Sequence, residues 1–427
     1  MRLHIEKPIY GGAGLARHEG KAIFVERALP GEIVEAEILR SKASYAEARI
    51  QALVEPSPER TAPSCQHYGA CGGCHYQHAS RSLELAMKKT ILAETLTRAR
   101  LAEFPEIQTL TAEPTGYRNR IRLHLRSKPF AVGYLKEQSH TLLAIEECTV
   151  AAPNLVEALR ALASQAEAEL TGWASEVELF TEDATQQILL SVYAPAKTKQ
   201  LEQKLTRLWQ KLQTILPSVI GCTVFAEPEG RGFARPIATA GEKSIHYRVG
   251  AHTYRVSAGS FFQVNRFLLA PMLTTVCAEH RGTTAWDLYA GVGLFTQPLA
   301  ERFEQVVAVE AAAGSVRDLR NNVPQAKITA ATTLDFIRRA TRNRMEPETK
   351  PDLILVDPPR AGLGQEAARL LAQIAAPNIT YVSCDPTTLS RDLFELLQSG
   401  YRIQSLTLMD LFPETFHMET VVQLSRL

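Results

Sequence analysis

The chain has 427 residues, of which 45% are hydrophobic and 22% are charged, and its formal net charge is +1. This is the balance of an ordinary globular protein, and the length suggests roughly two to four domains. No apolar run reaches the roughly eighteen residues of a membrane-spanning helix, and no apolar stretch follows the basic start of the chain. We therefore expect a cytoplasmic protein without a transmembrane helix or secretory signal.

Residues 1–54 show the pattern of a small β-module. Strands fit Ala22–Glu26 and Ile33–Ile38, which lie between turns rich in glycine and proline. Five-stranded β-barrels of the OB type have this size and bind nucleic acid. A structural module without a ligand fits the composition equally well, so the residues alone leave both interpretations open.

Residues 55–245 form a second region of mixed character. Three prolines and a group of cysteines come first, and the apolar spacing then predicts a helix at Leu83–Arg100. Strands at Ile121–Leu125 and Ile188–Val192 and helices at Pro153–Leu170 and Lys197–Leu212 fit the remainder. We expect a central α+β domain that carries the cysteines.

The last region, residues 246–427, changes pattern again from about residue 284, where apolar strands alternate with amphipathic helices. Strands fit Ala285–Tyr289, Val306–Glu310, Leu353–Val356, Ile379–Ser383 and Val421–Leu424. Helices fit Phe295–Phe303, Gly314–Asn321, Gln365–Ile374 and Thr388–Gln398. This alternation predicts a doubly wound, Rossmann-like α/β domain, whose ligands bind beyond the C-terminal ends of the strands.

A glycine turn ends the first strand of this domain. Gly291 and Gly293 let the backbone turn tightly and approach a ligand, but residue 296 is Thr where a dinucleotide fingerprint has its third glycine. A cofactor without a pyrophosphate, such as S-adenosylmethionine, therefore fits better than a dinucleotide. Glu310 ends the second strand, where acids of related folds accept hydrogen bonds from ribose hydroxyls.

Two further strand ends carry reactive side chains. Asp357-Pro358-Pro359-Arg360 presents a carboxylate, and Arg360 stands where enzymes that methylate base nitrogens have an aromatic residue. Cys384 ends the next strand, directly before a helix start that would favour a thiolate. An isolated cysteine is usually a small buried hydrophobe, but this one falls in the same cleft as Asp357.

Methylation at carbon 5 of a uracil needs such a set of groups. Thiolate addition at carbon 6 makes carbon 5 nucleophilic, and a base must afterwards remove the carbon 5 proton. His417-Met418-Glu419-Thr420 precedes the final strand and offers this base. Glu419 is our first choice and His417 the second, although an exposed loop carboxylate is the simpler interpretation of Glu419.

Cysteines at a second place have metal-ligand spacing. Cys65, Cys71 and Cys74 lie within ten residues with Gly72-Gly73 between the last two, and Cys148 is the best placed fourth ligand. Four thiolates suit either zinc or an iron–sulfur cluster. The uneven spacing differs from a zinc ribbon but does not decide between the two.

At this point the constellation resembles a known family, the RNA (uracil-5-)-methyltransferases. The motifs occur in that family's order and are Phe261-Phe262-Gln263-Val264-Asn265, Asp287-Leu288-Tyr289-Ala290-Gly291-Val292-Gly293, Asp357-Pro358-Pro359-Arg360-Ala361-Gly362, Ser383-Cys384-Asp385-Pro386 and His417-Met418-Glu419-Thr420. Residues 1–54 resemble the TRAM domain, an RNA-binding β-barrel, through Gly11-Gly12-Ala13-Gly14 and Leu29-Pro30-Gly31-Glu32.

The resemblance implies roles by position. Cys384 matches the nucleophile and Glu419 the base, while the residues that match contacts to the methyl donor or the uracil are Gln263, Tyr289, Gly291, Gly293, Glu310 and Asp357. It also implies a structural [4Fe-4S] cluster on Cys65, Cys71, Cys74 and Cys148. The chain departs from the family pattern at Leu294, at Asp385 and at Thr332-Thr333, which affects details of cofactor contact.

Local charge indicates where RNA binds. Arg118, Arg120, Arg122 and Arg126 alternate along one predicted strand and would face one side, toward phosphates or bases, and the target uracil must leave its stack to reach Cys384. A second basic group at residues 338–344 is better explained as a solvated helix face.

The sequence thus predicts a class I methyltransferase domain at 246–427 that uses S-adenosylmethionine to methylate carbon 5 of a uridine in RNA through a covalent Cys384 adduct. Transfer RNA enzymes of the family commonly lack the TRAM-like domain and the cysteine group, so 23S ribosomal RNA is favoured, with a tRNA uridine as the alternative. A non-catalytic RNA-binding protein with a decayed methyltransferase domain is the competing class, and no obligate protein partner is evident. Methylation of a small molecule would leave the RNA-binding features without a purpose.

Overall fold

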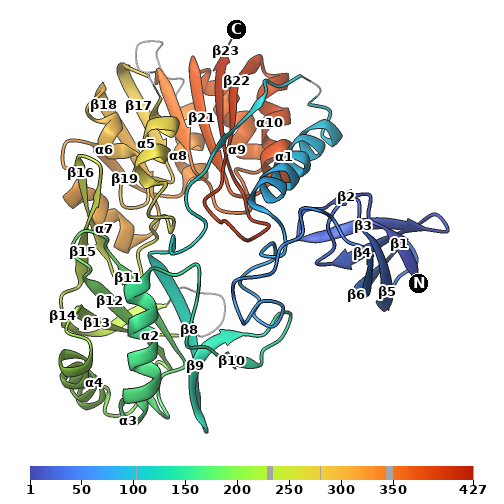
Figure 1. Ribbon diagram of the computed structural model, residues 1–427. Coiled ribbons are helices and arrows are strands. Elements are labelled where there is room, and N and C mark those ends of the chain that lie inside the picture. The colour runs from blue at the N-terminus through green and yellow to red at the C-terminus, as the bar shows by residue number, and fades with distance from the viewer. Residues whose placement is uncertain (102, 228–233, 279, 343–349, 427) are drawn as a thin grey trace.

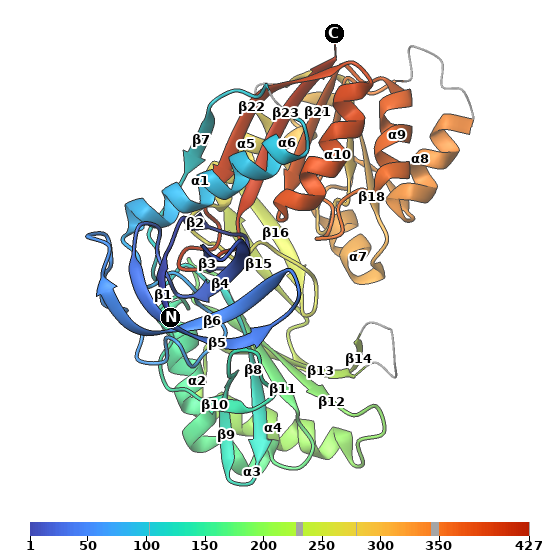
Figure 2. The same cartoon turned by 90° about the vertical axis from the view of Figure 1, so that its right-hand side faces the viewer.

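The computed structural model describes residues 1–101, 103–227, 234–278, 280–342 and 350–426. These residues form an N-terminal barrel, a central domain and a C-terminal domain (Figure 1). The C-terminal domain lies above the central domain in that view, and the barrel projects to the side at the height of the junction between them. Seen from that side, the barrel lies in front of the junction (Figure 2).

Six strands build the N-terminal barrel. They are β1 Arg2–His4, β2 Lys7–Pro8, β3 Ala13–His18, β4 Lys21–Glu26, β5 Ile33–Ser41 and β6 Tyr45–Glu55. Their order is β1-β5-β6-β4-β3-β2, and alternate side chains such as Ile23 and Val25 point into one small apolar core. Gly14 packs so closely that a Cβ atom there would lie 2.7 Å from Ile5 and 2.9 Å from the carbonyl oxygen of Ala28.

The central domain is a seven-stranded sheet with helices against one face. Its strands are β8 Arg120–Ser127, β9 Phe130–Leu135, β10 Leu142–Ala144, β11 Glu176–Thr181, β12 Ile188–Ala194, β13 Val219–Ala226 and β14 Arg235–Gly241, in the order β10-β9-β8-β11-β12-β13-β14. The helices are α2 Pro153–Gln165, α3 Glu167–Leu170 and α4 Leu201–Ile215. Leucines of α2 and α4 share one core with alternate residues of β8, β11 and β12.

The C-terminal domain is built on an eight-stranded sheet. Its strands are β17 Gly282–Leu288, β18 Phe303–Glu310, β19 Lys327–Ala330, β20 Leu353–Val356, β21 Asn378–Ser383, β22 Tyr401–Met409, β23 Glu419–Arg426 and β7 Ile107–Leu110. The order is β19-β18-β17-β20-β21-β23-β22-β7, and only β23 runs antiparallel to its neighbours. The predicted doubly wound sheet is therefore present, with a reversed strand that the sequence pattern did not indicate.

Helices cover both faces of this sheet. They are α5 Leu269–Cys277, α6 Thr296–Leu299, α7 Ala313–Asn322, α8 Thr333–Arg342, α9 Gln365–Ile374 and α10 Pro386–Gln398. Ile354 and Val356 of β20 face one core, shared with α9 and α10, while Leu353 and Leu355 face the other, shared with α5. Because both faces are buried, the strands read as continuous apolar runs.

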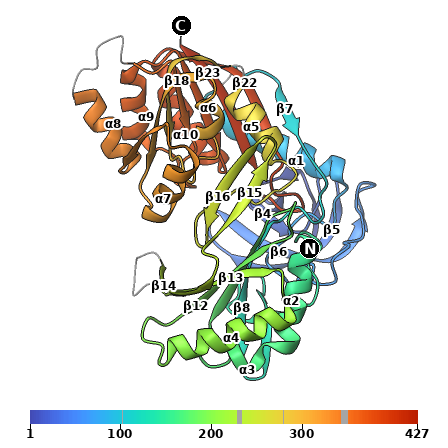
Figure 3. The same ribbon diagram turned by 90° about the vertical axis from the view of Figure 1, so that its left-hand side faces the viewer.

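Two elements N-terminal to the central sheet pack with the C-terminal domain. Helix α1 Arg81–Arg98 lies against α10, and β7 pairs with β22 at the edge of the C-terminal sheet. Helix α1 and β7 thus belong to this domain by packing, although they lie in the range expected for the central one. A hairpin of β15 Ser244–Val249 and β16 His252–Ser257 joins the two domains (Figure 3).

Candidate active site and cysteine cavity

The strand ends of the C-terminal sheet bring the predicted catalytic groups to one edge. Asp357 follows β20, Cys384 follows β21, and Glu419 is the first residue of β23. Because β23 is antiparallel to β21, with Ser383 opposite Thr420, its first residue lies at the edge where β21 ends. Glu419 is 3% exposed, so it is not the loop carboxylate in solvent that the sequence alone would favour.

The surroundings of Cys384 favour its neutral thiol. Burial raises the pKa of Cys384 to about 12, and the nearby carboxylates of Glu419 and Asp357 act in the same direction. We expected the start of α10 to stabilise the Cys384 thiolate. This detail is wrong, because the Asp385 carboxylate occupies the N-terminus of the helix. It accepts the backbone N–H groups of Thr387 at 2.9 Å and Thr388 at 3.0 Å, so Asp385 caps α10 instead of the thiol.

Two carboxyl groups flank the thiol. Burial and the charge of Asp357 raise the pKa of Glu419 well above its ordinary range, while Arg360 lowers it. Burial and the charge of Asp287 likewise raise the pKa of Asp357, opposed by a hydrogen bond from Gln263. Such raised pKa values bring carboxyl groups closer to neutrality, which suits proton transfer near pH 7.

His417 is a weaker candidate for the base than Glu419. Burial lowers the pKa of His417 to about 3, and the charge of Arg360 acts in the same direction. Nη2 of Arg360 lies 3.3 Å from Nδ1 of His417. A neutral imidazole with so low a pKa is a poor proton acceptor, which supports our first choice.

The glycine turn after β17 is fastened to the end of β18. The Glu310 carboxylate accepts the N–H groups of Gly291 at 2.9 Å and Ala312 at 2.6 Å. Tyr289, Gly291 and Gly293 all have positive φ angles, of 70°, 55° and 94°. A non-glycine residue in this region marks local strain of the kind that functional sites hold.

A small cavity of about 30 Å³ opens beside this turn. Its lining includes Gln263, Tyr289, Gly291 and Asp357, four of the six residues expected to contact the methyl donor or the base. A cavity of this volume encloses only part of a nucleoside-sized ligand, and the rest would extend along the open strand ends.

The three departures from the family pattern have structural explanations. Leu294 lines the same small cavity, and its carbonyl accepts the Tyr254 hydroxyl at 2.9 Å. Asp385 caps α10, and the Thr332 hydroxyl donates to Asp335 at 2.7 Å at the start of α8. None of these contacts removes Cys384, Asp357 or Glu419 from the site.

Four cysteines from two segments line one cavity. Cys65, Cys71 and Cys74 come from the stretch between β6 and α1, and Cys148 from the connection between β10 and α2, around a space of about 420 Å³. Burial and the charge of Cys148 raise the pKa of Cys74 to about 12. Cys148 thus lies on the same cavity as the three clustered cysteines, and its role as a fourth ligand stays a prediction.

Four thiolates suit either zinc or an iron–sulfur cluster, and the shared cavity does not choose between them. Among the described residues, no group of three or more His, Cys, Asp or Glu side chains is arranged to hold a metal ion. The cluster that the family resemblance implies therefore stays a prediction.

Several arginines of the basic strand β8 make contacts with other residues of the protein. Arg120 donates to the carbonyl of Ser260 at 2.8 Å and lies 3.6 Å from Glu178, and Arg122 pairs with Glu176 and lies over the ring of Tyr193. Arg118 lines the cysteine cavity. Arg122 and Arg126 are exposed as expected, whereas the ion pairs of Arg120 and Arg122 with glutamates of β11 engage part of the expected row of cations within the protein.

Sequence reasoning missed Tyr10, which reaches the nucleophile from the N-terminal barrel. Burial and the neighbouring carboxylate of Asp385 raise the pKa of the Tyr10 hydroxyl. Its ring meets the edge of Phe416 at 5.5 Å between centroids. The Gly11-Gly12 turn beside it, with φ angles of 107° and 95°, was the available signal.

Comparison with known proteins gives consistent matches. The family described as tRNA (Uracil-5-)-methyltransferase matches residues 80–427, and the TRAM domain matches residues 1–50. A relative in Salmonella choleraesuis, named 23S rRNA (uracil(1939)-C(5))-methyltransferase RlmD, is 33% identical and covers 97% of this chain and 94% of its own length. One in Pectobacterium atrosepticum with the same name is 32% identical, covering 96% and 90%.

Two other similarities extend over the whole chain. A protein of Aquifex aeolicus named uncharacterized RNA methyltransferase is 30% identical and covers 99% of this chain and 98% of its own. The crystal structure of Pyrococcus abyssi tRNA (uracil-54, C5)-methyltransferase with S-adenosyl-L-homocysteine has a TM-score of 0.78 at 23% identity, covering 99% and 100%. That likeness shows the fold. No helix in the described ranges is long and apolar enough to cross a membrane.

Proposed function

The chain belongs to the tRNA (Uracil-5-)-methyltransferase family, and we propose that it transfers a methyl group from S-adenosylmethionine to carbon 5 of a uridine in RNA. The observation that carries this proposal is the meeting of Cys384, Glu419 and Asp357 at one sheet edge, beside the glycine turn. A nucleophile, a base and a donor pocket are the parts that this reaction needs.

The donor side consists of Gln263, Tyr289, Gly291, Gly293, Glu310 and Asp357. Glu310 already accepts two backbone N–H groups, and a carboxylate retains further lone pairs for ribose hydroxyls. When bound, S-adenosylmethionine supplies a sulfonium-activated methyl group whose positive charge lowers the pKa of neighbouring thiols and carboxyl groups. The raised pKa values of Cys384 and Asp357 describe the site without that charge.

Cys384 forms the covalent bond to the base. The thiol passes its proton to solvent water, the thiolate sulfur bonds to carbon 6 of the uracil, and the electron pair of the carbon 5–carbon 6 double bond moves toward oxygen 4 as an enolate. Carbon 5 then takes the methyl group as the methyl–sulfonium bond breaks.

Glu419 completes the cycle. Its carboxylate removes the proton of carbon 5, the double bond forms again, and the bond between carbon 6 and sulfur breaks to release the Cys384 thiolate. The position of Glu419 at the start of β23 and its raised pKa support this role.

We also propose a [4Fe-4S] cluster on Cys65, Cys71, Cys74 and Cys148. Support comes from the one cavity of about 420 Å³ that all four cysteines line. The methyl transfer moves no electrons, so these cysteines would hold their segment in place and take no part in the chemistry. A cytoplasmic location, where thiols stay reduced, suits free cysteines of this kind.

The preferred substrate is 23S ribosomal RNA, because the full-length relatives with 32% and 33% identity carry that name. The fold does not discriminate, since a tRNA enzyme has the same architecture over the whole chain. Mapping 5-methyluridine in ribosomal and transfer RNA from cells with and without the gene would decide between the two.

The reaction is tested by trapping. RNA that carries 5-fluorouridine at the target should form a covalent complex with the wild-type protein and S-adenosylmethionine, because fluorine at carbon 5 cannot leave as a proton. Cys384→Ala should form no complex and methylate no uridine, whereas Cys277→Ala, which removes a thiol buried in another core, should retain both. Full methylation by Cys384→Ala would overturn the proposal.

A further inference from the structure

The connection between β22 and β23, residues 410–418, is held along its backbone. Four consecutive carbonyl groups each accept a hydrogen bond from a different segment of the chain. These bonds run from Asn265 to Leu411 at 3.1 Å, from Lys88 to Phe412 at 3.0 Å, from Tyr117 to Pro413 at 3.1 Å and from the N–H of His75 to Glu414 at 2.7 Å. The connection leads directly into Glu419, so its position, together with the pairing of Glu419 with Met409 of β22, sets where that carboxylate lies.

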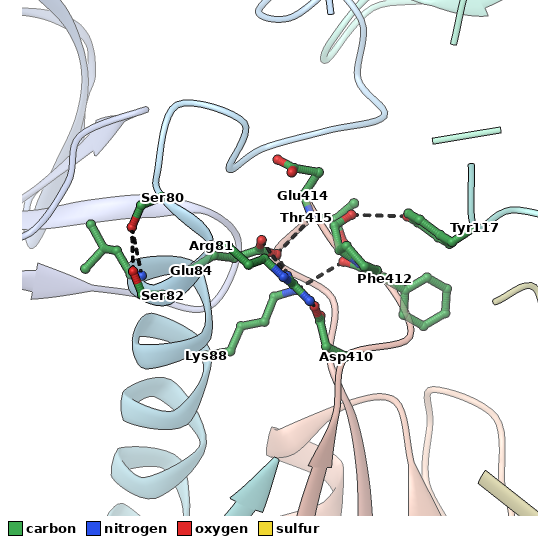
Figure 4. Close-up of polar contacts among 12 residues, drawn as sticks. Ser80, Arg81, Ser82, Glu84, Lys88, Tyr117, Asp410, Phe412, Glu414 and Thr415 are labelled. Carbon is green, nitrogen blue, oxygen red and sulfur yellow. Dashed lines mark hydrogen bonds and ion pairs between the residues drawn. The ribbon is translucent and has the colours of Figure 1, made fainter. Parts of the chain in front are cut away.

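Helix α1 supplies the charged part of this support. Nζ of Lys88 lies 2.6 Å from Oδ1 of Asp410 and 2.8 Å from Oε1 of Glu84, and Figure 4 shows the lysine pointing from the helix to the connection. Arg81 pairs with both carboxylates. The side chains of Lys88, Glu84 and Asp410 are at most 1% exposed, so a helix of another segment is fixed to the connection by a buried, charge-balanced group.

Glu84 also binds the backbone of the connection. Oε1 of Glu84 accepts the N–H of Glu414 at 2.8 Å. The backbone carbonyl of Glu414 accepts the N–H groups of His75 and Tyr76. Glu414 has a positive φ of 68°, a conformation that a non-glycine residue keeps only when its surroundings impose it. The helix thus binds the N–H of Glu414, and the cysteine-bearing segment binds the carbonyl of Glu414.

None of these contacts is made with the nucleophile. Cys384 lies at the end of β21, where Ser383 and Asp385 hold the turn and Asp385 caps α10. Loss of the support on α1 should therefore displace the connection and Glu419 more than Cys384.

We propose that Lys88 and Glu84 are positioning residues, which place Glu419 for removal of the carbon 5 proton. The inference rests on the proposed function, in which Glu419 is the base. It assigns the two residues to one step of the reaction, the release of the methylated base, and leaves nucleophilic attack and methyl transfer to other groups.

Two RNA substrates separate these steps. Trapping on 5-fluorouridine RNA needs attack and methyl transfer but no base, whereas turnover on uridine RNA needs all three. In Lys88→Met, turnover should fall by roughly tenfold or more. The upper limit of the loss is the 10²–10⁴-fold that a general base contributes to the rate. The trapping rate should stay within about threefold of wild type, and a covalent complex with uridine RNA should accumulate, which loss of stability alone does not produce.

Matched variants control for charge loss and for folding. Lys7→Met breaks an ion pair of 2.7 Å with Glu94 of α1 that includes no residue of the connection, and it should leave the ratio of turnover to trapping unchanged. If Lys88→Met shows no cooperative unfolding transition, Glu84→Gln serves instead, because glutamine keeps the acceptor for Glu414 and loses only the charge.

Equal losses of trapping and turnover in the folded variant, or unchanged turnover, would overturn the inference. Failure of the wild-type protein to trap 5-fluorouridine RNA would instead overturn the proposed function, so the two failures are distinguishable.

Discussion

Substitution of the base gives the sharpest test of the site. Glu419→Gln keeps the size of a side chain that is 3% exposed, so the β23 start should remain packed, but the amide cannot accept the carbon 5 proton. A positioned general base contributes about 10²–10⁴-fold to rate, which corresponds to about 3–5 kcal/mol of activation free energy. His417 cannot replace it, because its pKa is lowered to about 3 by burial and by Arg360.

The assay follows methyl transfer and release separately. Glu419→Gln should incorporate close to one methyl group per enzyme in a single turnover with radiolabelled S-adenosylmethionine, and the product should stay bound to Cys384 in denaturing gels. Steady-state turnover should fall by the factor above. His417→Gln serves as the matched control and should release product at nearly the wild-type rate. Full turnover by Glu419→Gln, or product retained by His417→Gln alone, would refute our assignment of the base.

Three further predictions address pH, the donor turn and the cysteine cavity. Activity should decline as the pH falls, because Glu419 and Cys384 both act deprotonated and both have raised pKa values. Asp357→Asn should move this limb of the measured pH–rate profile to lower pH, because it removes a negative charge beside both groups. An unmoved limb would contradict the influence of Asp357. Gly293→Ala should lower the melting temperature and weaken binding of the methyl donor in calorimetry more than Gly291→Ala does. Both positions have positive φ, but only a Cβ at residue 293 would lie 2.8 Å from Leu319. Equal effects of the two substitutions would argue against this close approach. Cys148→Ser should reduce iron content and the broad absorbance near ~400 nm of an iron–sulfur protein, whereas Cys222→Ser, in the core of the central domain, should not; undiminished iron would exclude Cys148 as a ligand.

Features that depend on local pattern could be predicted from the residues alone. Four predicted parallel strands match β17, β18, β20 and β21 to within three residues at each end, because apolar runs and turn residues are signals within a few positions. The same strands place Tyr289, Glu310, Asp357 and Cys384 at one edge, since parallel strands end together. The glycine turn and the spacing of three cysteines are likewise local.

Features that depend on pairing between distant segments could not be predicted from local pattern and are seen only in the folded structure. The antiparallel insertion of β23 brings Glu419 beside Cys384, and α1 and β7 join the C-terminal domain from far upstream. Alternation along β8 predicted that its arginines share one face, and Arg122 and Arg126 are exposed there, but the partners of Arg120 and Arg122 come from distant segments that no local pattern specifies. The hydrogen bond from Lys88 to the carbonyl of Phe412 joins residues that are 324 positions apart. Such a contact arises only when separate apolar faces pack together.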